Sequence, residues 1–463
     1  MKNFRYIWFL CLAIALPFFV ACNEDDEVGS QSEPMNIVQV YLEDADATVT
    51  DRKVDFARLG QVIRIEGSGF LGLKKLYING HETYFNNALV TNNNIWVTLD
   101  SKTPVAEADP EYRNTIRLKK DETECIYEFI IRAASPQIKS VNNTLPAAGE
   151  KVTVFGSNLQ ETTKITLPGG VEVTSGIESD EDGEWYSFIM PEGVTEGGSI
   201  LSEGANGTAK TPAFFNEKRG MILDFDGTGV QGGWSATYMP EDLTTDPLNS
   251  GRGNVVPAVP ASVLAEAGIQ GGAHGKGWFT AGGEKGSWSD PTENWTRFYD
   301  LIPAETPVEN IALQFDVYVP EEWSTGMLEF TLQNNLSNYG YGSTETTNTT
   351  NIEYPMAVVW VPWLTEDGQK VPYKTEGWTT ITIPVSSIGK YQNAEAGHTF
   401  ATVCADRAAA SYANFGMFLV NTDVEYSETV LFEATEFNQE VYVDNWRLVP
   451  YESFVISDFP DEE

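Results

Sequence analysis

Tyr354-Pro-Met-Ala-Val-Val-Trp360-Val-Pro-Trp363 is the stretch that decides the fold, together with Gly377-Trp-Thr-Thr-Ile-Thr-Ile-Pro384 a little further along the chain. Both are rich in Val, Ile, Thr and aromatic residues and carry proline near their ends, a pattern that predicts two β-strands. Trp360 and Trp363 are three residues apart, so regular alternation would place them on opposite faces of a sheet. One indole ring can then fill a core while the other faces solvent or a ligand.

The same strand pattern recurs along the chain after the N-terminal leader, and no helical periodicity of useful length accompanies it. Apolar residues from Ile311 to Val319 alternate with a second set that includes Gln314 and Asp316, which predicts a strand with one buried face. Short strands separated by Gly, Asn and Pro turns are typical of β-sandwiches, so we expect an all-β protein.

Length and charge limit the possible functions. A chain of 463 residues is long enough for roughly three domains. Its 67 Asp and Glu residues far outnumber its 29 Lys and Arg residues, which gives a formal net charge of −38. Nucleic-acid binding requires a basic surface and a polyanionic ligand would be repelled, so the composition favours a neutral ligand.

The N-terminus has the pattern of a secreted protein. Two basic residues precede an apolar run from Tyr6 to Val20, which predicts a signal peptide at residues 1–21. The run ends in Phe19-Val-Ala-Cys22, which resembles a bacterial lipobox, so we expect Cys22 to be the lipidated first residue of the mature protein.

A polar tether is expected to follow the lipid anchor, over residues 22–35. Its acidic start, Asn23-Glu-Asp-Asp-Glu27, resembles the surface-export signal of Bacteroidetes lipoproteins. Acyl chains hold a protein on a membrane without a spanning helix. The expected location is therefore the outer membrane, with the protein exposed on the cell surface.

Two segments of the chain repeat one motif. Gly60-Gln-Val-Ile-Arg-Ile-Glu-Gly67-Ser-Gly-Phe70 matches Gly149-Glu-Lys-Val-Thr-Val-Phe-Gly156-Ser-Asn-Leu159 at an offset of 89 residues, about the length of a small immunoglobulin-like sandwich. With the opening Ser135-Pro-Gln-Ile-Lys-Ser-Val141 of the second copy, the motif resembles the IPT/TIG family of immunoglobulin-like domains. We therefore expect an immunoglobulin-like domain at 36–133 and an IPT/TIG domain at 134–217.

The chain from residue 218 to residue 463 has a different composition. Nine of the twelve tryptophans lie in it, together with clusters of glycine. Met221-Ile-Leu-Asp-Phe-Asp-Gly227 predicts its first strand, and Glu440-Val-Tyr-Val-Asp-Asn-Trp-Arg-Leu-Val449 predicts its last. A domain of this length made of such strands is expected to be one large β-sandwich of the jelly-roll type.

Several motifs of this last domain resemble those of a known family. The sequence contains Leu223-Asp-Phe-Asp-Gly227, Phe315-Asp-Val-Tyr-Val-Pro320, Trp360-Val-Pro-Trp363, Gly377-Trp-Thr-Thr-Ile-Thr-Ile-Pro384 and Val443-Asp-Asn-Trp-Arg-Leu-Val449. This set is similar to the glycan-binding domain of Bacteroidetes surface glycan-binding proteins, lipoproteins encoded beside SusC/SusD-like transporters in polysaccharide utilisation loci. The resemblance implies a cell-surface protein that binds a neutral plant polysaccharide, such as a β-glucan or a xyloglucan-type hemicellulose. It also implies a SusC/SusD-like uptake system as the partner.

Aromatic residues in loops are the candidate glycan contacts. A pyranose ring presents a face of C–H groups that packs flat against an aromatic ring, and Trp and Tyr offer such rings at low cost in conformational entropy. Side chains available for this contact should be next to Gly, Ser or Asn, because a core residue would lie in an apolar strand. By this criterion the predicted aromatic platform consists of Trp278, Trp288, Trp295, Tyr339, Tyr341 and Trp363.

Other tryptophans are predicted to be structural. Trp378 and Trp446 lie in well-formed strands and Trp360 alternates with apolar neighbours, so all three are expected in the core. Trp96 and Trp185 stand beside apolar residues late in the two smaller domains, and we expect them to pack in a core or between modules.

The sequence predicts no cofactor, because Asp-rich turns are common in so acidic a chain, and a structural calcium ion is the one alternative. Asp224 and Asp226 lie at the first strand of the last domain and Asp444 lies on its last strand. If those strands pair, the three carboxylates would supply the oxygen ligands that calcium prefers.

Two other functions are compatible with parts of the sequence. A glycoside hydrolase needs two carboxylates on opposite sides of the scissile bond, and so acidic a chain offers many chance pairs. The sequence has no nucleophile elbow or Ser-His-Asp arrangement, however, and His81, His274 and His398 lack metal-ligand spacing, so we predict a binding protein and not an enzyme. Repeated sandwiches on a lipid anchor would also suit a protein-binding adhesin.

Overall fold

The computed structural model describes residues 31–43, 50–228, 243–258, 278–279, 295–332, 357–365, 367–409, 415–421, 424–427, 430–432 and 435–452. Its contacts divide the chain into two compact units, Met1–Ala134 and Ser135–Glu463. The predicted signal peptide and the predicted lipidation site, Cys22, lie outside the described residues. No helix among the residues that are described is long and apolar enough to cross a membrane.

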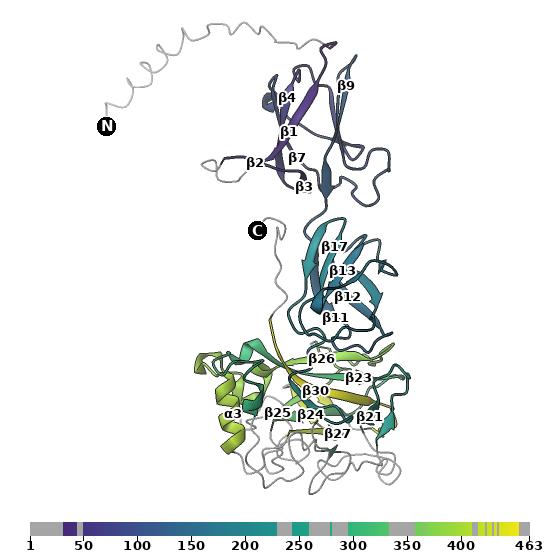
Figure 1. The fold of residues 1–463 in the computed structure, drawn as a ribbon, viewed down its shortest axis with the longest axis vertical. Coiled ribbons are helices and arrows are strands. Elements are labelled where there is room, and N and C mark those ends of the chain that lie inside the picture. The colour runs from purple at the N-terminus through teal and green to yellow at the C-terminus, as the bar shows by residue number, and fades with distance from the viewer. Residues whose placement is uncertain are drawn as a thin grey trace, which may run out of the picture. The chain divides into compact units, whose positions relative to one another are not determined.

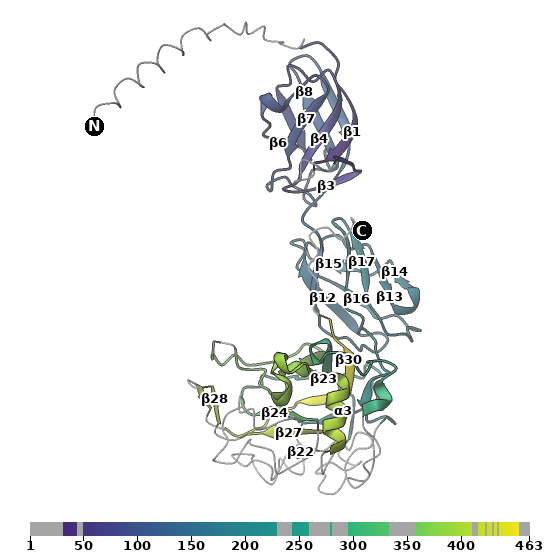
Figure 2. The same ribbon diagram turned by 90° about the vertical axis from the view of Figure 1, so that its left-hand side faces the viewer.

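The first unit contains a sandwich of two four-stranded sheets (Figures 1 and 2). One sheet has the strand order β2-β1-β4-β7 and the other has the order β6-β5-β8-β9, while β3 and β10 form a parallel pair. Alternation along each strand buries one row of side chains, as in β4, where Ile63 and Ile65 are buried and Arg64 is not. The elements are β1 (Asn36–Leu42), β2 (Arg52–Lys53), β3 (Phe56–Arg58), β4 (Val62–Ser68), β5 (Lys75–Ile78), β6 (His81–Thr83), η1 (Asn87–Leu89), β7 (Asn94–Thr98), β8 (Thr115–Lys119), β9 (Glu124–Glu128) and β10 (Ile130–Arg132).

The second unit begins with a similar sandwich. Its two sheets have the strand orders β11-β12-β16-β15 and β14-β13-β17-β18, and its core includes Val152, Val154 and Tyr186. The elements are β11 (Gln137–Val141), β12 (Lys151–Ser157), β13 (Lys164–Leu167), η2 (Pro168–Gly170), β14 (Val171–Val173), β15 (Glu178–Ser179), β16 (Trp185–Ile189), β17 (Leu201–Gly204) and β18 (Gly207–Lys210).

The repeated Gly-Ser motif has the same structural role in both sandwiches. Gly67 pairs with Ile37 and Gly156 pairs with Ile138, and in each case the register of the two strands shifts directly beside that pair. A Cβ atom on either glycine would overlap a backbone carbonyl oxygen of the neighbouring strand. Glycine is therefore required at both positions because the two backbones approach too closely for a side chain.

The last domain has two principal sheets and an α-helix. One sheet has the order β20-β21-β30-β23-β26, with β19 also paired to β30, and the other has the order β22-β27-β24-β25. The elements are β19 (Met221–Leu223), β20 (Thr244–Thr245), β21 (Asn254–Pro257), β22 (Trp278–Phe279), η4 (Trp295–Phe298), η5 (Val308–Asn310), β23 (Ile311–Tyr318), β24 (Met327–Thr331), β25 (Ala357–Trp360), β26 (Thr379–Pro384), η7 (Val385–Ser387), η8 (Gly389–Tyr391), η9 (Ala394–Ala396), α3 (Phe400–Ala409), β27 (Gly416–Val420), β28 (Val424–Ser427), β29 (Val430–Phe432) and β30 (Tyr442–Pro450).

The predicted all-β class is confirmed, and so are strands in both of the stretches that open the sequence analysis, as β25 and β26. The prediction missed α3, which buries Phe400, Val403 and Cys404 against the core of the last domain. Helix α3 has only ten residues and a weak apolar stripe, so its periodicity does not stand out in a sequence of strands.

Strand β23 corrects one prediction about burial. All of its residues except Tyr318 are buried, whereas the alternation in the sequence predicts one buried face. The sheet that contains β23 and β30 lies between the second sandwich and the sheet that contains β24 and β27 (Figures 1 and 2). Its polar face, with Gln314 and Asp316, is therefore covered by the second sandwich and not by solvent.

Candidate functional site

The sheet β22-β27-β24-β25 is the one farther from the second sandwich, and we call it the outer sheet. Its strands connect to most of the candidate aromatic residues. Its register aligns Trp278 with Phe418, Phe418 with Glu329, and Glu329 with Val359, in one row across four strands. Phe330, the residue after Glu329 on β24, faces the core, since its ring packs on Phe315 with ring centroids 4.6 Å apart. The row of Glu329 is therefore on the other face, away from the β23 sheet.

Four of the six candidate aromatic residues belong to the strands or connections of this outer sheet. Trp278 begins β22, and the chain that follows β22 contains Trp288. Tyr339 and Tyr341 occur in the connection from β24 to β25. Trp288, Tyr339 and Tyr341 lie outside the described residues, and of Trp278 the backbone alone is described. These four assignments therefore remain predictions.

Trp295 is buried, so the prediction that it contributes to an exposed platform is wrong. Its exposed fraction is 0%, and the guanidinium carbon of Arg407 lies 3.7 Å from the centre of its ring. Phe298, in the same 3₁₀ turn, packs beside the indole at 6.5 Å. A ring face already covered by a guanidinium cannot also accept a sugar ring. The neighbouring Asn and Thr suggested a loop, but they do not reveal that Arg407 of α3 packs there.

Trp363 is also buried, and its predicted role in the platform is wrong for the same kind of reason. Only 2% of its surface is exposed, and its Nε1–H donates to the carbonyl oxygen of Gly326 at 2.6 Å. The Nζ atom of Lys370 lies 5.3 Å from the ring centre. Trp363 thus joins the β24–β25 region to its surroundings as a hydrogen-bonded core residue.

The tryptophans assigned to the core are found there. Trp378 and Trp446 are 2% and 0% exposed. Trp360 is half-buried and packs edge to face on Phe315 and Trp323, with ring centroids 5.4 and 5.6 Å apart. Strand alternation correctly predicts that Trp360 is structural, but it does not predict that Trp363 is structural as well.

Glu329 is an unusual residue in the outer sheet. It is 0% exposed, and neither carboxylate oxygen has a hydrogen-bond partner among the described residues. Burial raises the pKa of Glu329 well above its ordinary value, because an unpaired carboxylate is poorly solvated there. Burial therefore favours the uncharged form more than it would be favoured in an exposed glutamate. No signal in the sequence marked this glutamate among 67 acidic residues.

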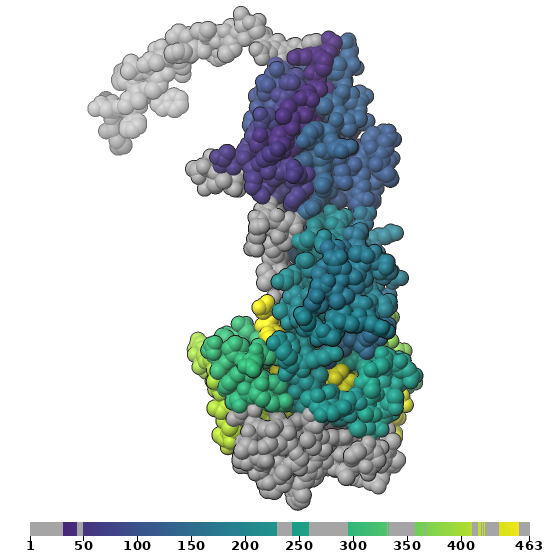
Figure 3. Space-filling view, in the orientation of Figure 1, coloured from purple at the N-terminus to yellow at the C-terminus, as the bar shows by residue number. Residues whose placement is uncertain are grey.

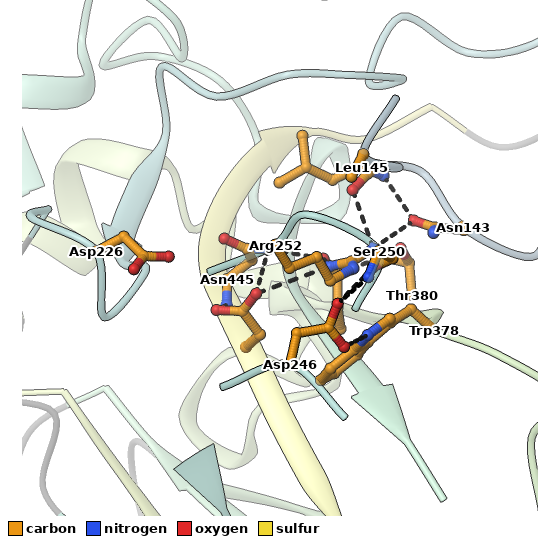
Figure 4. A network of polar contacts seen from close by, with 12 residues as sticks. Asn143, Leu145, Asp226, Asp246, Ser250, Arg252, Trp378, Thr380 and Asn445 are labelled. Carbon is orange, nitrogen blue, oxygen red and sulfur yellow. Dashed lines mark hydrogen bonds and ion pairs between the residues drawn. The ribbon is translucent and has the colours of Figure 1, made fainter. Parts of the chain in front are cut away.

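A polar network that the sequence analysis missed connects the second sandwich to the last domain. Arg252, in the turn between β20 and β21, is its centre, and 2% of its side chain is exposed. It donates two hydrogen bonds to Glu150 at 3.1 Å and one to Asp316 at 2.8 Å. It also donates to Asn143 and to the carbonyl oxygen of Leu145, and Figure 4 shows the side chain directed toward both.

The turn that presents Arg252 is held by Asp246. Its carboxylate accepts hydrogen bonds from the backbone and hydroxyl of Ser250 and from the indole nitrogen of Trp378 at 2.9 Å. Burial would raise the pKa of Asp246, but these hydrogen bonds outweigh it and lower the pKa. The Arg252 guanidinium lies 4.8 Å from the ring centre of Trp378. Trp378 therefore positions both the turn, through Asp246, and the guanidinium of Arg252.

Asp316 is the shared partner of two arginines. It accepts hydrogen bonds from Arg252, from Arg447 at 3.2 Å and from the hydroxyl of Thr380 at 2.7 Å. Burial would raise its pKa, yet the charges of Arg447 and Arg252 hold the pKa of Asp316 below its ordinary value. For Arg252, burial would lower the pKa, but the carboxylates raise it. Each charge is therefore compensated, as a buried ionic group requires.

Thr144 adds a direct contact between the second sandwich and the last domain. Its hydroxyl accepts a hydrogen bond from Arg447 and donates one to Gln314, and its backbone N–H donates to the hydroxyl of Thr380. The space-filling view shows the second sandwich in contact with the last domain (Figure 3). The sequence contains one indication of this contact, the polar residues Gln314 and Asp316 within an otherwise largely apolar strand.

The predicted calcium ligands do not form a cluster. Asp444 lies 3.8 Å from Arg252, whose guanidinium supplies positive charge at that point. Asp226 accepts hydrogen bonds from Asn254, and Figure 4 shows it apart from the Arg252 network. Among the residues described, no group of three or more His, Cys, Asp or Glu side chains could hold a metal ion. The prediction of calcium at Asp224, Asp226 and Asp444 is therefore not supported.

Two carboxyl groups with raised pKa values also bear on a hydrolytic mechanism. Burial raises the pKa of Asp444 well above its ordinary value, as it does for Glu329. Asp444 belongs to β30 and faces the second sandwich, whereas Glu329 belongs to the other sheet. These two groups do not face each other across one cleft, as an acid–base pair of a glycosidase would.

Comparison with known proteins identifies the last domain. A family model described as the surface glycan-binding protein B xyloglucan binding domain matches residues 215–450, just over half of the chain. The chain belongs to this surface glycan-binding protein B family. The resemblance inferred from the sequence motifs is thereby confirmed.

Several known structures and sequences are similar to this chain, and the first of them supports the fold. The crystal structure of surface glycan-binding protein PbSGBP-B from Prevotella bryantii matches 91% of this chain and 100% of that one, with a TM-score of 0.62 and 18% identity. An SGBP-B from a complex xyloglucan utilization locus in Bacteroides uniformis matches 90% of this chain and 99% of that one, with a TM-score of 0.47 and 17% identity. An IPT/TIG domain-containing protein from Bacteroides ovatus is 22% identical over 214 residues, 46% of this chain and 40% of that protein. This chain thus spans about two fifths of that relative's length.

Proposed function

We propose that this protein is a cell-surface lipoprotein that captures a neutral plant polysaccharide, of the β-glucan or xyloglucan type, through its last domain. The match of residues 215–450 to the surface glycan-binding protein B family carries this proposal. The acidic composition supports a neutral ligand, because a net charge of −38 would repel a polyanion. Delivery to a SusC/SusD-like uptake system and anchoring through Cys22 complete the proposed role.

Trp278, Trp288, Tyr339 and Tyr341 are the aromatic residues that we propose as the sugar platform. They belong to β22 or to connections of the outer sheet, whereas Trp295 and Trp363 are buried in the core. Flat rings that stack on the C–H face of a pyranose give affinity without charge, which suits a neutral polymer. Neighbouring polar groups would then receive the sugar hydroxyls.

Binding without cleavage is the part of this proposal that separates it from a hydrolase. The two described carboxyl groups with strongly raised pKa values lie on different sheets, and the similar proteins are described as glycan-binding proteins. Incubation with soluble xyloglucan or mixed-linkage β-glucan should therefore release no reducing ends. New reducing ends in proportion to the amount of protein would overturn this part.

Affinity gel electrophoresis with soluble xyloglucan and mixed-linkage β-glucan tests the platform. Trp288→Ala and the double change at Tyr339 and Tyr341 to alanine should each weaken retardation about tenfold, as expected when an aromatic anchor of an interface is truncated. Phe155→Ala is a control, because Phe155 is a large exposed side chain of the second sandwich with 41% of its surface accessible. Wild-type retardation by both polysaccharides in all variants would refute the assignment.

The surface location is tested separately. Cys22→Ala should release the protein from the membrane fraction, since the lipid anchor would be lost. Protease added to intact cells should degrade the wild-type protein, and complete protection of whole cells would contradict the proposed location.

A further inference from the structure

An exposed aromatic side chain in the first sandwich stands outside the function proposed for the last domain. Tyr84, directly after β6, is 82% exposed, the highest value for a large apolar side chain among the residues described. The other strongly exposed side chains of this kind are mostly aliphatic, at single positions on strands, such as Val38 and Ile126. Scattered residues of that kind are normal on a protein surface, but an exposed aromatic ring beside a hollow is less common.

Thr83, Tyr84 and Phe85 line two hollows of the surface, and Tyr84 is the one of the three whose side chain is exposed, whereas Thr83 is buried. The first hollow has a volume of about 870 Å³ and the second about 580 Å³. Two open hollows that share lining residues can be crossed by an extended chain, whereas a small molecule is usually held in an enclosed pocket. We refer to these three residues as the Tyr84 segment.

Trp96 provides a second aromatic ring in the first hollow. It lies between Ile95 and Val97 on β7, both of which are buried, so its own side chain is on the outer face of the sheet. Its half-buried ring and Leu89, 47% exposed, line the hollow with Tyr84. Of the two placements predicted for Trp96, the core is therefore excluded, because strand parity turns its side chain outward, while packing between modules stays a prediction.

The polar groups of the first hollow suit hydroxyl groups. Glu43 and Asp100 are the charged residues of its described lining, which contains no Lys or Arg. A backbone hydrogen bond from Lys102 lowers the pKa of Asp100, so this group is an ionised acceptor at neutral pH. Carboxylates accept hydrogen bonds from sugar hydroxyls and repel anions. Asn86 and Thr98 add neutral groups that can both donate and accept.

We propose that the Tyr84 segment and Trp96 form a second contact for the same neutral polysaccharide that the last domain binds. This inference rests on the proposed function, because it assumes that the polymer is the ligand of the last domain. Both contacts lie on one chain, so the second becomes intramolecular once a long polymer has bound the first, and the two together bind more tightly than either alone. Even a weak second contact then raises the affinity for a long polymer by about threefold to tenfold.

The test compares a polymer with a short oligosaccharide in the full-length protein. Tyr84→Ala should weaken retardation by soluble xyloglucan or mixed-linkage β-glucan about threefold to tenfold, because the second contact is lost. Binding of a heptasaccharide from the same polymer, measured by calorimetry, should not change, because a short ligand occupies the last domain alone. Ile126→Ala is the matched control, since Ile126 is 59% exposed in the same sandwich but lines neither hollow.

Each outcome of this comparison supports or overturns a second polysaccharide contact at Tyr84. Retardation of Tyr84→Ala equal to that of the wild type overturns the second contact. Equal losses for polymer and heptasaccharide also overturn it, because there would then be one binding site and not two. Failure of the proposed function is distinguishable, since the wild-type protein itself would then bind neither the polymers nor the heptasaccharides.

Discussion

Replacing Arg252 by methionine removes the cation that holds the second sandwich to the last domain. The side chain makes five hydrogen bonds of 2.8–3.2 Å, to Glu150, Asp316, Asn143 and the carbonyl oxygen of Leu145. Methionine keeps much of the apolar stem but leaves buried carboxylates without this partner. Loss of one member of a buried ionic network costs about 3–5 kcal/mol in the free energy of unfolding.

The expected change in melting temperature follows from the size of the unit. For a large cooperative unit, about 1 kcal/mol corresponds to ~2 °C, so Arg252→Met should lower the melting temperature by ~6–10 °C. Calorimetry of the full-length protein should also show a broader, less cooperative transition, because the Arg252 contacts between the second sandwich and the last domain are lost while those of Thr144 remain.

Lys151→Met is the control for the loss of a charge in the same unit. Lys151 forms an exposed ion pair with Glu178 at 3.1 Å, and such pairs contribute about 0–1 kcal/mol. If Arg252→Met lowers the melting temperature no more than Lys151→Met does, the claim that the buried network couples the two domains is refuted.

Three further changes test other parts of the structure. Glu329→Gln should stabilise the protein increasingly as the pH rises above about 4.3, because the raised pKa of Glu329 means that the folded state must retain a proton that the unfolded chain releases; a thermal-shift difference that stays constant from pH 4 to 8 would contradict this. Trp363→Phe should cost about 1–3 kcal/mol through the lost hydrogen bond to Gly326 but leave polysaccharide affinity unchanged; weaker binding at unchanged stability would be evidence for a ligand contact. Gly156→Ala should cost about 3 kcal/mol in urea unfolding because its Cβ meets the carbonyl oxygen of Gln137, whereas Gly377→Ala, with open space around it, should cost little.

Local patterns in the sequence were sufficient to predict the strands and the repeat. The Gly-Ser motif at Gly67 and Gly156 repeats because each glycine lies where two strands approach closely, a constraint of the local backbone that any copy of the sandwich must satisfy. Alternation likewise located β23 and β26, because side chains on a strand alternate whatever covers them.

Burial by distant segments could not be predicted in the same way. The sequence predicts that Asp316 faces solvent on β23. In the structure it is buried, because the second sandwich, with Thr144 and Glu150, covers that face of the sheet. The sequence predicts that Trp295 is a loop residue. In the structure Arg407, more than one hundred positions later in the chain, covers its ring. In both cases the decisive partner comes from another element, and neighbouring residues in the sequence carry no information about it.

The distribution of positive charge connects the fold to the proposed ligand. Arg58, Lys120, Arg252, Arg407 and Arg447 are all buried, although the whole chain has only 29 Lys and Arg residues. Arginine suits such positions because its planar group can satisfy several acceptors at once while remaining charged. Cations placed in the interior do not neutralise the acidic exterior, so the surface that a polysaccharide meets is more negative than an even spread of charge would make it. A ligand for such a surface must gain its affinity from ring stacking and hydroxyl hydrogen bonds. Aromatic rings beside carboxylates, as at Tyr84, Trp96 and Asp100, are the groups that provide both.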